Sequence, residues 1–571
     1  MDDNSDHNGI PAAIHVDDWN DDDAAEVSSH LMMEDEEPFI QDLILDLGED
    51  IMFESLRDSR LTHLELEDGC CSDWFLRGIR ERVEEFFQAM RQNTSVHQVS
   101  VSGEFLKEMT TLWEESAAAS HHQADNDEDV AVSFDWMLLD AISQLPALKT
   151  LIVQEVIDFD GYRMPVDYLQ HVLHQAKRLE TLTLRFVELA NPSEQDDLDA
   201  SLTYLLPHRE DENTVANRTL FQAFRNHAAL RALTLTQLRL EEGISLNSLI
   251  RGIATIPNLQ TVKLHMSVQR QQERRHIRVL DDNNDENNTN NNRHSAQHTA
   301  SLKPLAQQCE SLQVLELSSL CMRDEAEFLQ ALQRHKSLKT LSLAHAELSF
   351  SGWAALAHMM QTQRHELHLE SLHLDHMSGL DNDTLKLCSG ALGGGTASSS
   401  LRDLRLLNVM DMGRVGWKAI ADMIASNQSL QSLSLENCQG MDDDAVTGIV
   451  NALQHNTTLR KLELQVFAGH CTRFSQKVGQ KAFVELLRSG RNITLVNLYT
   501  QASGDLEAQL ECYLNLNRTG LRPFVLQKEL PPNAGASDFW NLLQQYNNDL
   551  DILFYVLTTN PPFVISCLRG L

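Results

Sequence analysis

Four histidines lie within twelve residues of one short stretch, which reads RHELHLESLHLDH and contains His365, His368, His373 and His376. Imidazole nitrogens are common zinc ligands, so this spacing raises the question of a metal site. The zinc-protease pattern H-E-x-x-H is absent, however, because residue 369 is a leucine. We therefore interpret the histidines as surface groups that face solvent or a protein partner, and we predict no bound metal.

The rest of the chain offers no recognisable catalytic constellation. It lacks the G-x-x-x-x-G-K-[ST] loop that cradles phosphates and the G-x-S-x-G turn that carries a nucleophilic serine. The glycine run 393–395 is followed by Thr396 without a lysine, which predicts a flexible loop. We predict that the chain is not an enzyme and needs no cofactor.

The chain instead repeats a short leucine motif, so we turn to the elements that this motif builds. Residues 427–464 begin with N-x-S-L-x-x-L-x-L and end with N-x-T-L-x-x-L-x-L. Most intervals between motifs are near 30 residues, and the three intervals near 52 each contain an insertion. Apolar residues at positions 1, 4 and 6 define thirteen windows, which begin at Leu61, Val96, Leu148, Leu179, Leu230, Leu259, Leu312, Leu338, Leu369, Leu401, Leu430, Leu459 and Ile493.

Each motif predicts a strand followed by a helix. Positions 4 and 6 are two residues apart, so both side chains point to one side of a strand. After one such motif, Val446, Ile449, Val450 and Leu453 recur at helical spacing, and Asp442–Asp444 stand where carboxylates cap a helix N-terminus. Strands that all run in one direction, each returned by a helix, predict an α/β solenoid with a parallel sheet.

Packing widths predict that this solenoid curves into a horseshoe of about thirteen repeats. Strands lie about 4.8 Å apart while helices need about 10 Å, so the strands line the concave face and the helices the convex face. The motif and its period resemble the leucine-rich repeat, in its ribonuclease-inhibitor-like subclass, over residues 61–510. That family usually has Asn or Cys at position 9, which only Cys438 matches here. We expect apolar side chains to pack this turn instead, at Leu238, Leu320, Ala346, Met377 and Val409.

The resemblance and the solvent-facing strand positions together suggest a binding surface. Those positions carry charges of mixed sign, which suits a protein partner and lacks the basic stripe of a nucleic-acid-binding protein. We expect a monomeric scaffold that binds a protein partner on its concave face. The candidate partner-binding residues are Arg185, Lys263, His265, His373, Asp375, Arg405, Glu436, Lys461, Glu463 and Tyr499.

An alternative function is the regulation of a small GTPase. The chain is similar to the Ran GTPase-activating protein in joining repeats of this subclass to an acidic segment. Here the acidic segment lies at the opposite end of the chain, and the resemblance does not match that family's functional residues one by one to residues of this sequence. GTP hydrolysis measured with and without this protein would distinguish the two hypotheses.

Charge is concentrated at the N-terminus. The net charge is -37, and the first fifty residues carry 17 aspartates and glutamates and no lysine or arginine. Such a charge argues against nucleic acid or an anionic membrane as the main partner. Residues 1–37 are aperiodic as well as acidic, which predicts a disordered tail.

Several features suggest the cytoplasm. No apolar run reaches the eighteen residues of a membrane span, no secretory signal is visible, and the nine cysteines include no CxxC pair. The nucleus remains an alternative, because the arginines within 270–278 form either a nuclear import patch or a solvated charged flank.

Segments outside the repeats complete the predicted domain organisation. Residues 38–60 interleave acidic and apolar side chains and are interpreted as an N-terminal cap built on a helix, with a partner-recognition helix or an acidic activation-type segment as alternatives. Insertions near 113–131, 190–217 and 268–300 are expected to be disordered loops. Residues 511–571 are interpreted as a C-terminal helical cap, with helices near 539–546 and 550–557.

Overall fold

A computed structural model gives the fold, and two compact units emerge, residues 1–162 and 163–571. The repeat pattern did not predict this boundary. The structure describes residues 42–44, 61–66, 79–121, 133–155, 162–191, 214–225, 227–241, 243–267, 299–362, 368–393, 400–410, 412–465, 476–488, 493, 495–499, 510, 513–514 and 517.

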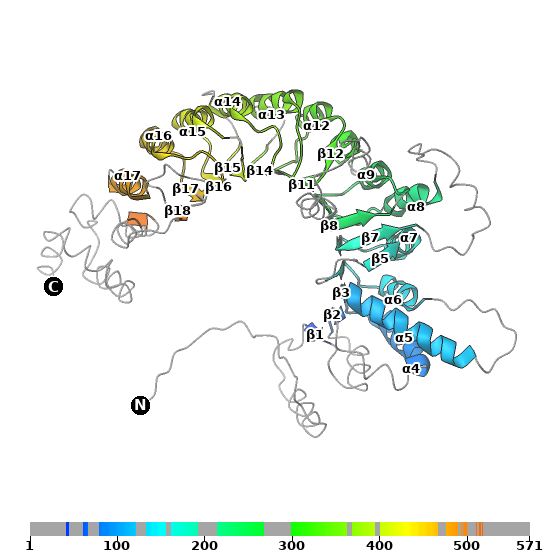
Figure 1. The fold of residues 1–571 in the computed structure, drawn as a ribbon. Coiled ribbons are helices and arrows are strands. Elements are labelled where there is room, and N and C mark those ends of the chain that lie inside the picture. The colour runs from blue at the N-terminus through cyan, green and yellow to red at the C-terminus, as the bar shows by residue number, and fades with distance from the viewer. Residues whose placement is uncertain are drawn as a thin grey trace, which may run out of the picture. The chain divides into compact units, whose positions relative to one another are not determined.

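The described residues of the first unit form four parallel strands that pair in chain order (Figure 1). Helices connect the later strands and pack on one another through Phe87 and Phe134, both fully buried. The elements are β1 (Asp42–Ile44), β2 (His63–Leu66), α4 (Ile79–Gln92), β3 (Gln98–Ser102), α5 (Gly103–His121), α6 (Phe134–Ser143) and β4 (Thr150–Gln154). The short strand β5 (Tyr162–Pro165) spans the boundary between the units.

The second unit is a longer array of the same kind, in which ten main strands lie in the order β6-β8-β9-β11-β13-β14-β15-β16-β17-β18. These strands are β6 (Thr181–Arg185), β8 (Ala232–Leu240), β9 (Thr261–Met266), β11 (Val314–Ser318), β13 (Thr340–Ala344), β14 (Ser371–Asp375), β15 (Asp403–Leu407), β16 (Ser432–Glu436), β17 (Lys461–Gln465) and β18 (Leu495–Tyr499). Short accessory strands are β7 (Val187–Ala190), β10 (Thr299–Ala300) and β12 (Cys321–Met322).

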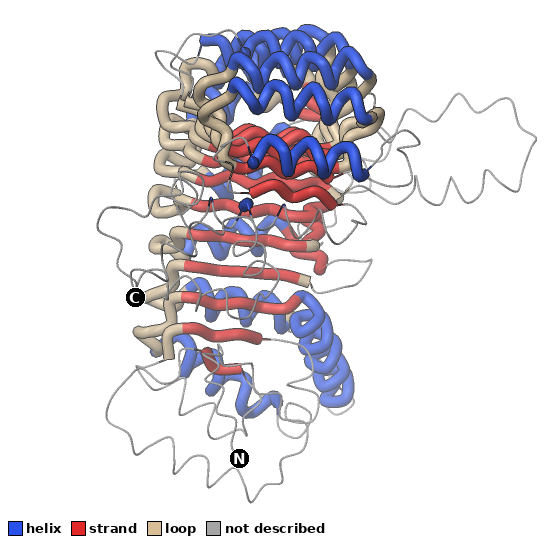
Figure 2. The backbone as a smooth tube through the Cα atoms, turned by 90° about the vertical axis from the view of Figure 1, so that its left-hand side faces the viewer, coloured by secondary structure: helices blue, strands red, loops and turns tan. Residues whose placement is uncertain are grey.

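Helices return the chain between these strands. They are α7 (Val166–Gln175), α8 (Val215–Phe224), α9 (Leu246–Ala254), α11 (Lys303–Gln308), α12 (Glu325–Leu332), α13 (Phe350–Thr362), α14 (Asn382–Gly393), α15 (Arg414–Ser426), α16 (Asp443–His455) and α17 (Gln476–Arg488). Within this unit the helices follow the outside of an arc and the strands its inside (Figure 1). Figure 2 shows the strands side by side like rungs, with the helices in a separate layer. We call the strand side of the second unit the concave face.

The predicted α/β repeat solenoid is confirmed, since a strand begins two residues after the start of each of the thirteen windows. The physical cause is as predicted: in β16, Leu433 and Leu435 are 0% exposed because they face the helix layer. In α16 the apolar stripe that contains Val446 and Ile449 is buried against the sheet. The Asp442 side chain accepts a 2.9 Å hydrogen bond from the Ala445 amide and caps the helix.

A left-handed backbone corner follows many of the strands. Its residue occupies motif position 8, and its N–H donates to the carbonyl at the end of the next strand; His345, for example, donates to Asp375 across 2.9 Å. His and Asn tolerate this conformation better than most residues. Position 9 is buried, as predicted from its apolar residues. The corner residues with positive φ are Phe186, Gln237, Ser319, His345, His376, Asn408 and Asn437.

A ladder of buried polar side chains lies at the opposite turn, three residues before position 1. The Asn456 side chain donates to the carbonyls of Ile424 and Asn427, and its oxygen accepts from the amides of Thr458 and Leu459. In an earlier repeat, His335 takes the same position. These groups satisfy carbonyls at helix ends that would otherwise be buried without a partner.

Two predictions about segments outside the repeats are wrong. Residues 42–44, in the segment expected to form a capping helix, form β1 and pair in parallel with β2, because an open sheet edge offers unpaired backbone groups to an extended segment. The helix α5 runs to His121, through the first half of the insertion expected at 113–131. The acidic tail 1–37, most of the other insertions and the C-terminal helices near 539–557 lie outside the described residues.

Two further observations concern membrane-spanning helices and cysteines. None of the helices that the structure describes has both the length and the apolar character needed to cross a membrane. Among the described cysteines, Cys309, Cys388 and Cys438 are buried free thiols, and burial raises the pKa of each thiol to about 12.

Candidate functional site

The concave face is built from strand positions 3, 5 and 7 of each repeat, whose side chains point away from the core. Strand pairing places all residues at position 5 in one continuous row across the sheet. We call this the central row. In strand order it contains Thr183, Thr234, Lys263, Glu316, Ser342, His373, Arg405, Ser434, Glu463 and Asn497.

The ten sequence-predicted candidates all lie on the strands at these outward positions. Lys263, His373, Arg405 and Glu463 lie in the central row. Arg185, His265, Asp375, Glu436 and Tyr499 lie at position 7, and Lys461 lies at position 3. They are partly exposed or exposed wherever their side chains are described; the side chain of Tyr499 is outside that set. These residues thus occupy the outward strand positions that the motif indicates, and their role in binding stays a prediction.

One pair of neighbouring strands carries a salt-bridged cluster. The Lys263 ammonium lies 3.0 Å from one Glu316 carboxylate oxygen, and the His265 imidazole lies 4.0 Å from the other. Burial lowers the pKa of His265, the Glu316 charge opposes that shift, and the Lys263 charge adds to it. The carboxylate thus forms a salt bridge with Lys263 and lies near the His265 imidazole of the same strand.

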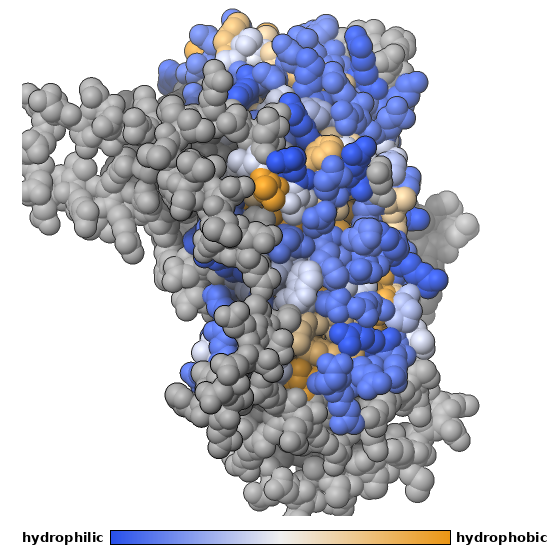
Figure 3. Space-filling view, turned by 90° about the vertical axis from the view of Figure 1, so that its right-hand side faces the viewer, coloured by the Kyte–Doolittle hydropathy of each residue, from blue (hydrophilic) through white to orange (hydrophobic). Residues whose placement is uncertain are grey.

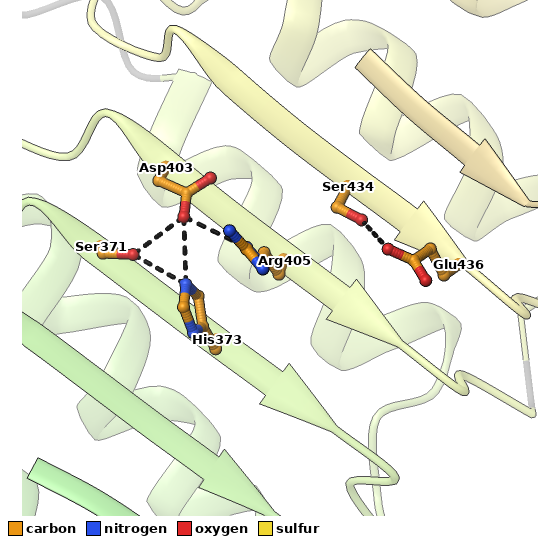
Figure 4. Close-up of polar contacts among 6 residues, drawn as sticks. All are labelled: Ser371, His373, Asp403, Arg405, Ser434 and Glu436. Atoms are coloured by element: carbon orange, nitrogen blue, oxygen red, sulfur yellow. Dashed lines mark hydrogen bonds and ion pairs between the residues drawn. The ribbon is translucent and has the colours of Figure 1, made fainter. Parts of the chain in front are cut away.

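A second polar cluster spans β14 and β15 (Figure 4). Asp403 Oδ2 lies 3.0 Å from His373 Nε2, 3.0 Å from Ser371 Oγ and 3.3 Å from Arg405 Nε. Burial disfavours the Asp403 carboxylate, but hydrogen bonds from His373, Ser432 and Ser371 and the Arg405 charge outweigh it and hold the pKa of Asp403 well below its ordinary value. Asp403 therefore stays ionised and orders the side chains around it.

The Ser371, His373 and Asp403 side chains resemble a hydrolytic triad only in composition. In a working triad the histidine contacts the serine through one ring nitrogen and the carboxylate through the other. Here His373 Nε2 contacts both Ser371 Oγ, at 2.8 Å, and Asp403 Oδ2. A proton taken from the serine would thus arrive at the same nitrogen that the carboxylate occupies. This arrangement can order a surface and bind a ligand, but it does not activate a nucleophile.

Of the four histidines that are close in sequence, the three that the structure describes do not converge on one point. His368 precedes β14 and His376 follows it, and a strand of this length separates them by about 16 Å. His373 points to the concave face between them, and His365 lies outside the described residues. His376 instead stacks on His345 of the preceding repeat, with ring centroids 4.4 Å apart.

Sequence reasoning missed three residues that complete these clusters. Glu316, Asp403 and His345 were not among the candidates, although Glu316 and Asp403 occupy outward motif positions 5 and 3. Aligning the thirteen windows would have found these two acids beside Lys263 and Arg405. His345 lies outside the triplet, at the left-handed corner, so the triplet itself held no signal for it.

Exposed apolar side chains are scattered over the described surface and do not gather in one place. In the view of Figure 3, hydrophilic side chains cover most of the described surface, and apolar ones are scattered. The large apolar side chains that are exposed among the described residues, namely Phe186, Val215, Phe350, Met410 and Val415, come from different elements. They form no apolar docking patch of the size that usually marks an interface.

Comparison with known proteins leaves the family open. No family model matches the sequence, and no curated protein matches it. Among solved structures, 122 chains match, including the leiomodin-1 actin-binding site 2. The aligned residues are 17% identical and cover 32% of this chain and 96% of the leiomodin chain, and the two structures superpose with a TM-score of 0.26. A likeness of this extent carries no argument about this chain.

Proposed function

We propose that this protein is a diverged leucine-rich repeat protein of the ribonuclease-inhibitor-like subclass and acts as a non-enzymatic scaffold that binds a protein partner on its concave face. The subclass assignment is supported by the L-x-x-L-x-L motif, the period near 29 residues and the alternation of parallel strands with helices. The apolar position 9 is a departure from the family pattern, and its burial explains how the turn packs without the usual Asn or Cys.

The central row is the observation that carries the binding proposal. Its side chains are mounted on hydrogen-bonded strands, and several are held by their neighbours before any partner arrives. Lys263 is fixed by Glu316 and Arg405 by Asp403. The buried Ser434 Oγ donates a 2.7 Å hydrogen bond that holds Glu436 beside the row (Figure 4). Preorganised groups lose less conformational entropy on binding, which favours affinity and specificity.

The chemistry of this row favours a protein over a nucleic acid. Its charged residues are of both signs and are interspersed with uncharged ones, whereas a nucleic-acid surface needs a continuous run of Lys and Arg to neutralise phosphates. A surface of mixed charge matches a folded partner with complementary charges of both signs. A partner that spans several strands would read the spacing of Lys263, His373 and Arg405 along the sheet.

Charge reversal on the two faces tests this proposal. Arg405→Glu changes the concave face, and Lys418→Glu, on the exposed side of α15, is its matched control on the helix side. We expect proteins captured from a lysate of the native cells by the tagged wild type to include at least one that Lys418→Glu retains and Arg405→Glu loses. A purified partner should then bind Arg405→Glu at least about tenfold more weakly, which corresponds to about 1.4 kcal/mol.

Two results would reject the proposal. One is that every captured partner is retained equally by both variants. The other is that a fragment with the acidic tail and the insertions alone retains all partners after the repeats are deleted. Circular dichroism and thermal unfolding of both variants ensure that a loss of binding reflects the surface rather than the fold.

A further inference from the structure

We propose that His345, Asp375 and His376 form a binding site for one divalent transition-metal ion, for which Zn²⁺ is the probe. The proposal goes beyond the scaffold function and does not depend on it. It also revises the expectation of no metal, because the second histidine comes from the preceding repeat and not from the histidine-rich stretch. One nitrogen or oxygen from each residue lies within 4.8 Å of the others.

The backbone brings these three groups together. His345 and His376 both follow a strand in the left-handed corner, with φ of 48° and 46°, and their strands β13 and β14 are paired. Equivalent atoms on neighbouring strands lie about 4.8 Å apart, so the two imidazoles leave the sheet edge side by side. Asp375 ends β14, and its Oδ1 lies 2.8 Å from His376 Nδ1. The cluster therefore follows from repeat geometry and not from one side-chain rotamer.

Hydrogen bonds around the carboxylate orient it for such a role. The Asn408 side-chain amide, from the same corner of the next repeat, donates to Asp375 Oδ1 across 2.7 Å. The Asn437 side chain in turn donates to Asn408. Carboxylates that bind metals usually accept hydrogen bonds of this kind, which hold them in the orientation that the metal needs. The corners after β13 and β14 thus supply the two histidines, and the corners after β15 and β16 supply Asn408 and Asn437, which support the carboxylate.

The donor set indicates the class of metal. Two imidazoles and one carboxylate suit Zn²⁺ and its first-row neighbours, whereas Ca²⁺ and Mg²⁺ prefer all-oxygen sites. Tetrahedral Zn²⁺ requires ligand atoms about 3.3 Å apart. The ligand atoms must therefore approach one another by up to about 1.5 Å. The stacked imidazoles of His345 and His376 must also turn toward a common point, which the exposure of both histidines permits. Three protein ligands leave the fourth position to water or to a group from a partner.

Titration of the full-length protein with ZnCl₂ tests the site. Metal is first removed with a chelator, and binding is followed by isothermal titration calorimetry. We expect a saturable site for one Zn²⁺ per chain. His345→Asn and His376→Asn should each weaken Zn²⁺ binding at least about tenfold, because each removes one of three ligands. Asn is suited to the left-handed corner, as Asn408 and Asn437 show, so both variants should fold.

His368→Asn is the matched control, since it removes a histidine from the same stretch at the far end of β14. It should bind Zn²⁺ with wild-type affinity. Asp375→Asn keeps the side-chain shape, removes the charge and should also weaken binding. The inference is overturned if the wild type shows no saturable Zn²⁺ binding. It is equally overturned if His345→Asn and His376→Asn bind as tightly as His368→Asn, which would mean that Zn²⁺ binds other histidines.

Discussion

At the scale of single residues, histidine and asparagine share one structural task in this chain. Both occupy the buried turn three residues before the leucine triplet and contact a backbone carbonyl of the preceding repeat. His335 Nε2 lies 2.6 Å from the Cys309 carbonyl, and His227 Nε2 lies 3.1 Å from that of Ala176. The side-chain amides of Asn427 and Asn456 likewise donate to a backbone carbonyl of the preceding repeat. Unlike the amide, the imidazole can take up a proton.

Replacing His335 by Asn should therefore reduce the pH dependence of stability. Burial lowers the pKa of His335 below 6.5, and the Cys309 carbonyl only partly offsets this effect. As the pH falls below about 6.5, the unfolded chain binds a proton that the folded chain resists, so the free energy of unfolding falls. An asparagine side chain keeps a hydrogen-bond donor for the Cys309 carbonyl but takes up no proton, so the His335→Asn variant lacks this pH-dependent loss of stability. Chemical denaturation between pH 8 and pH 5 should show a shallower decline for His335→Asn than for wild type.

The control for this prediction is His368→Asn, at an exposed position before β14. It should leave the decline with pH as steep as in the wild type. An unchanged decline in His335→Asn would mean that the imidazole takes up its proton as readily in the folded state as in the unfolded chain.

Residue positions were predictable from the sequence where the leucine triplet dictates them. The alternation of core-facing and outward-facing side chains placed Lys263, His373 and Arg405 on the concave face. The contacts across strands were not predicted, because Glu316 is 53 residues from Lys263 and Asp403 is 30 residues from His373, and these pairs become neighbours only when the register between strands is known. His345 was hidden for a related reason, since it acquires its role from a corner conformation that no local pattern encodes.

At the scale of elements, strong periodicity predicted the main strands and helices, and tertiary context decided the rest. The triplets and the stripe in α16 correspond to observed elements because burial of the same apolar positions determines both. The accessory strands β7 and β12 escaped prediction because they lie outside the leucine triplet and form by pairing with other short or neighbouring strands. The segment at 42–44 became a strand because the edge of β2 was available for pairing.

Two glycines in adjacent elements should respond oppositely to substitution by alanine. Gly379 has φ of 78°, and a Cβ there would lie 2.8 Å from the Leu348 carbonyl oxygen. Gly379→Ala should destabilise the fold by about 1–2 kcal/mol or more, because a left-handed alanine is strained even without that overlap. Gly390 lies within α14, where an added Cβ would meet open space, so Gly390→Ala should stabilise by about 0.5–1 kcal/mol.

Urea denaturation of both variants and the wild type measures these effects. The two substitutions add the same methyl group within one repeat, so each serves as the control for the other. If Gly379→Ala matched or exceeded the wild type in stability, the turn between β14 and α14 could not be held in the left-handed form observed.

At the scale of the whole molecule, each repeat of the second unit contacts mainly the repeats on either side of it. The strands pair in chain order, and each helix packs on its neighbours along the outer layer. Stability in such an array is close to a sum of nearest-neighbour terms, and a local defect is felt locally. This behaviour suits a binding surface assembled strand by strand, since the central row can adjust in one part while remaining ordered in another.

Two equivalent tryptophans allow this locality to be measured. Trp353 in α13 and Trp417 in α15 occupy matching positions two repeats apart and are 0% and 1% exposed. Replacing Trp417 by Ala removes a large core side chain, a change that typically costs about 3–5 kcal/mol, and also removes the 3.1 Å hydrogen bond from its indole to the Gln439 carbonyl. Hydrogen exchange followed by mass spectrometry should show faster exchange in β14 to β16 and little change in β6 to β9.

Trp353→Ala should move that region of faster exchange toward the N-terminus by two repeats, to the strands around β13. The shift between the two variants separates a local response from a general loss of stability, because the same side chain is removed from the same motif position in each. Faster exchange spread evenly over all strands of the second unit in both variants would contradict the nearest-neighbour description. The unit would then unfold as one cooperative body, and its concave face would be ordered or lost as a whole.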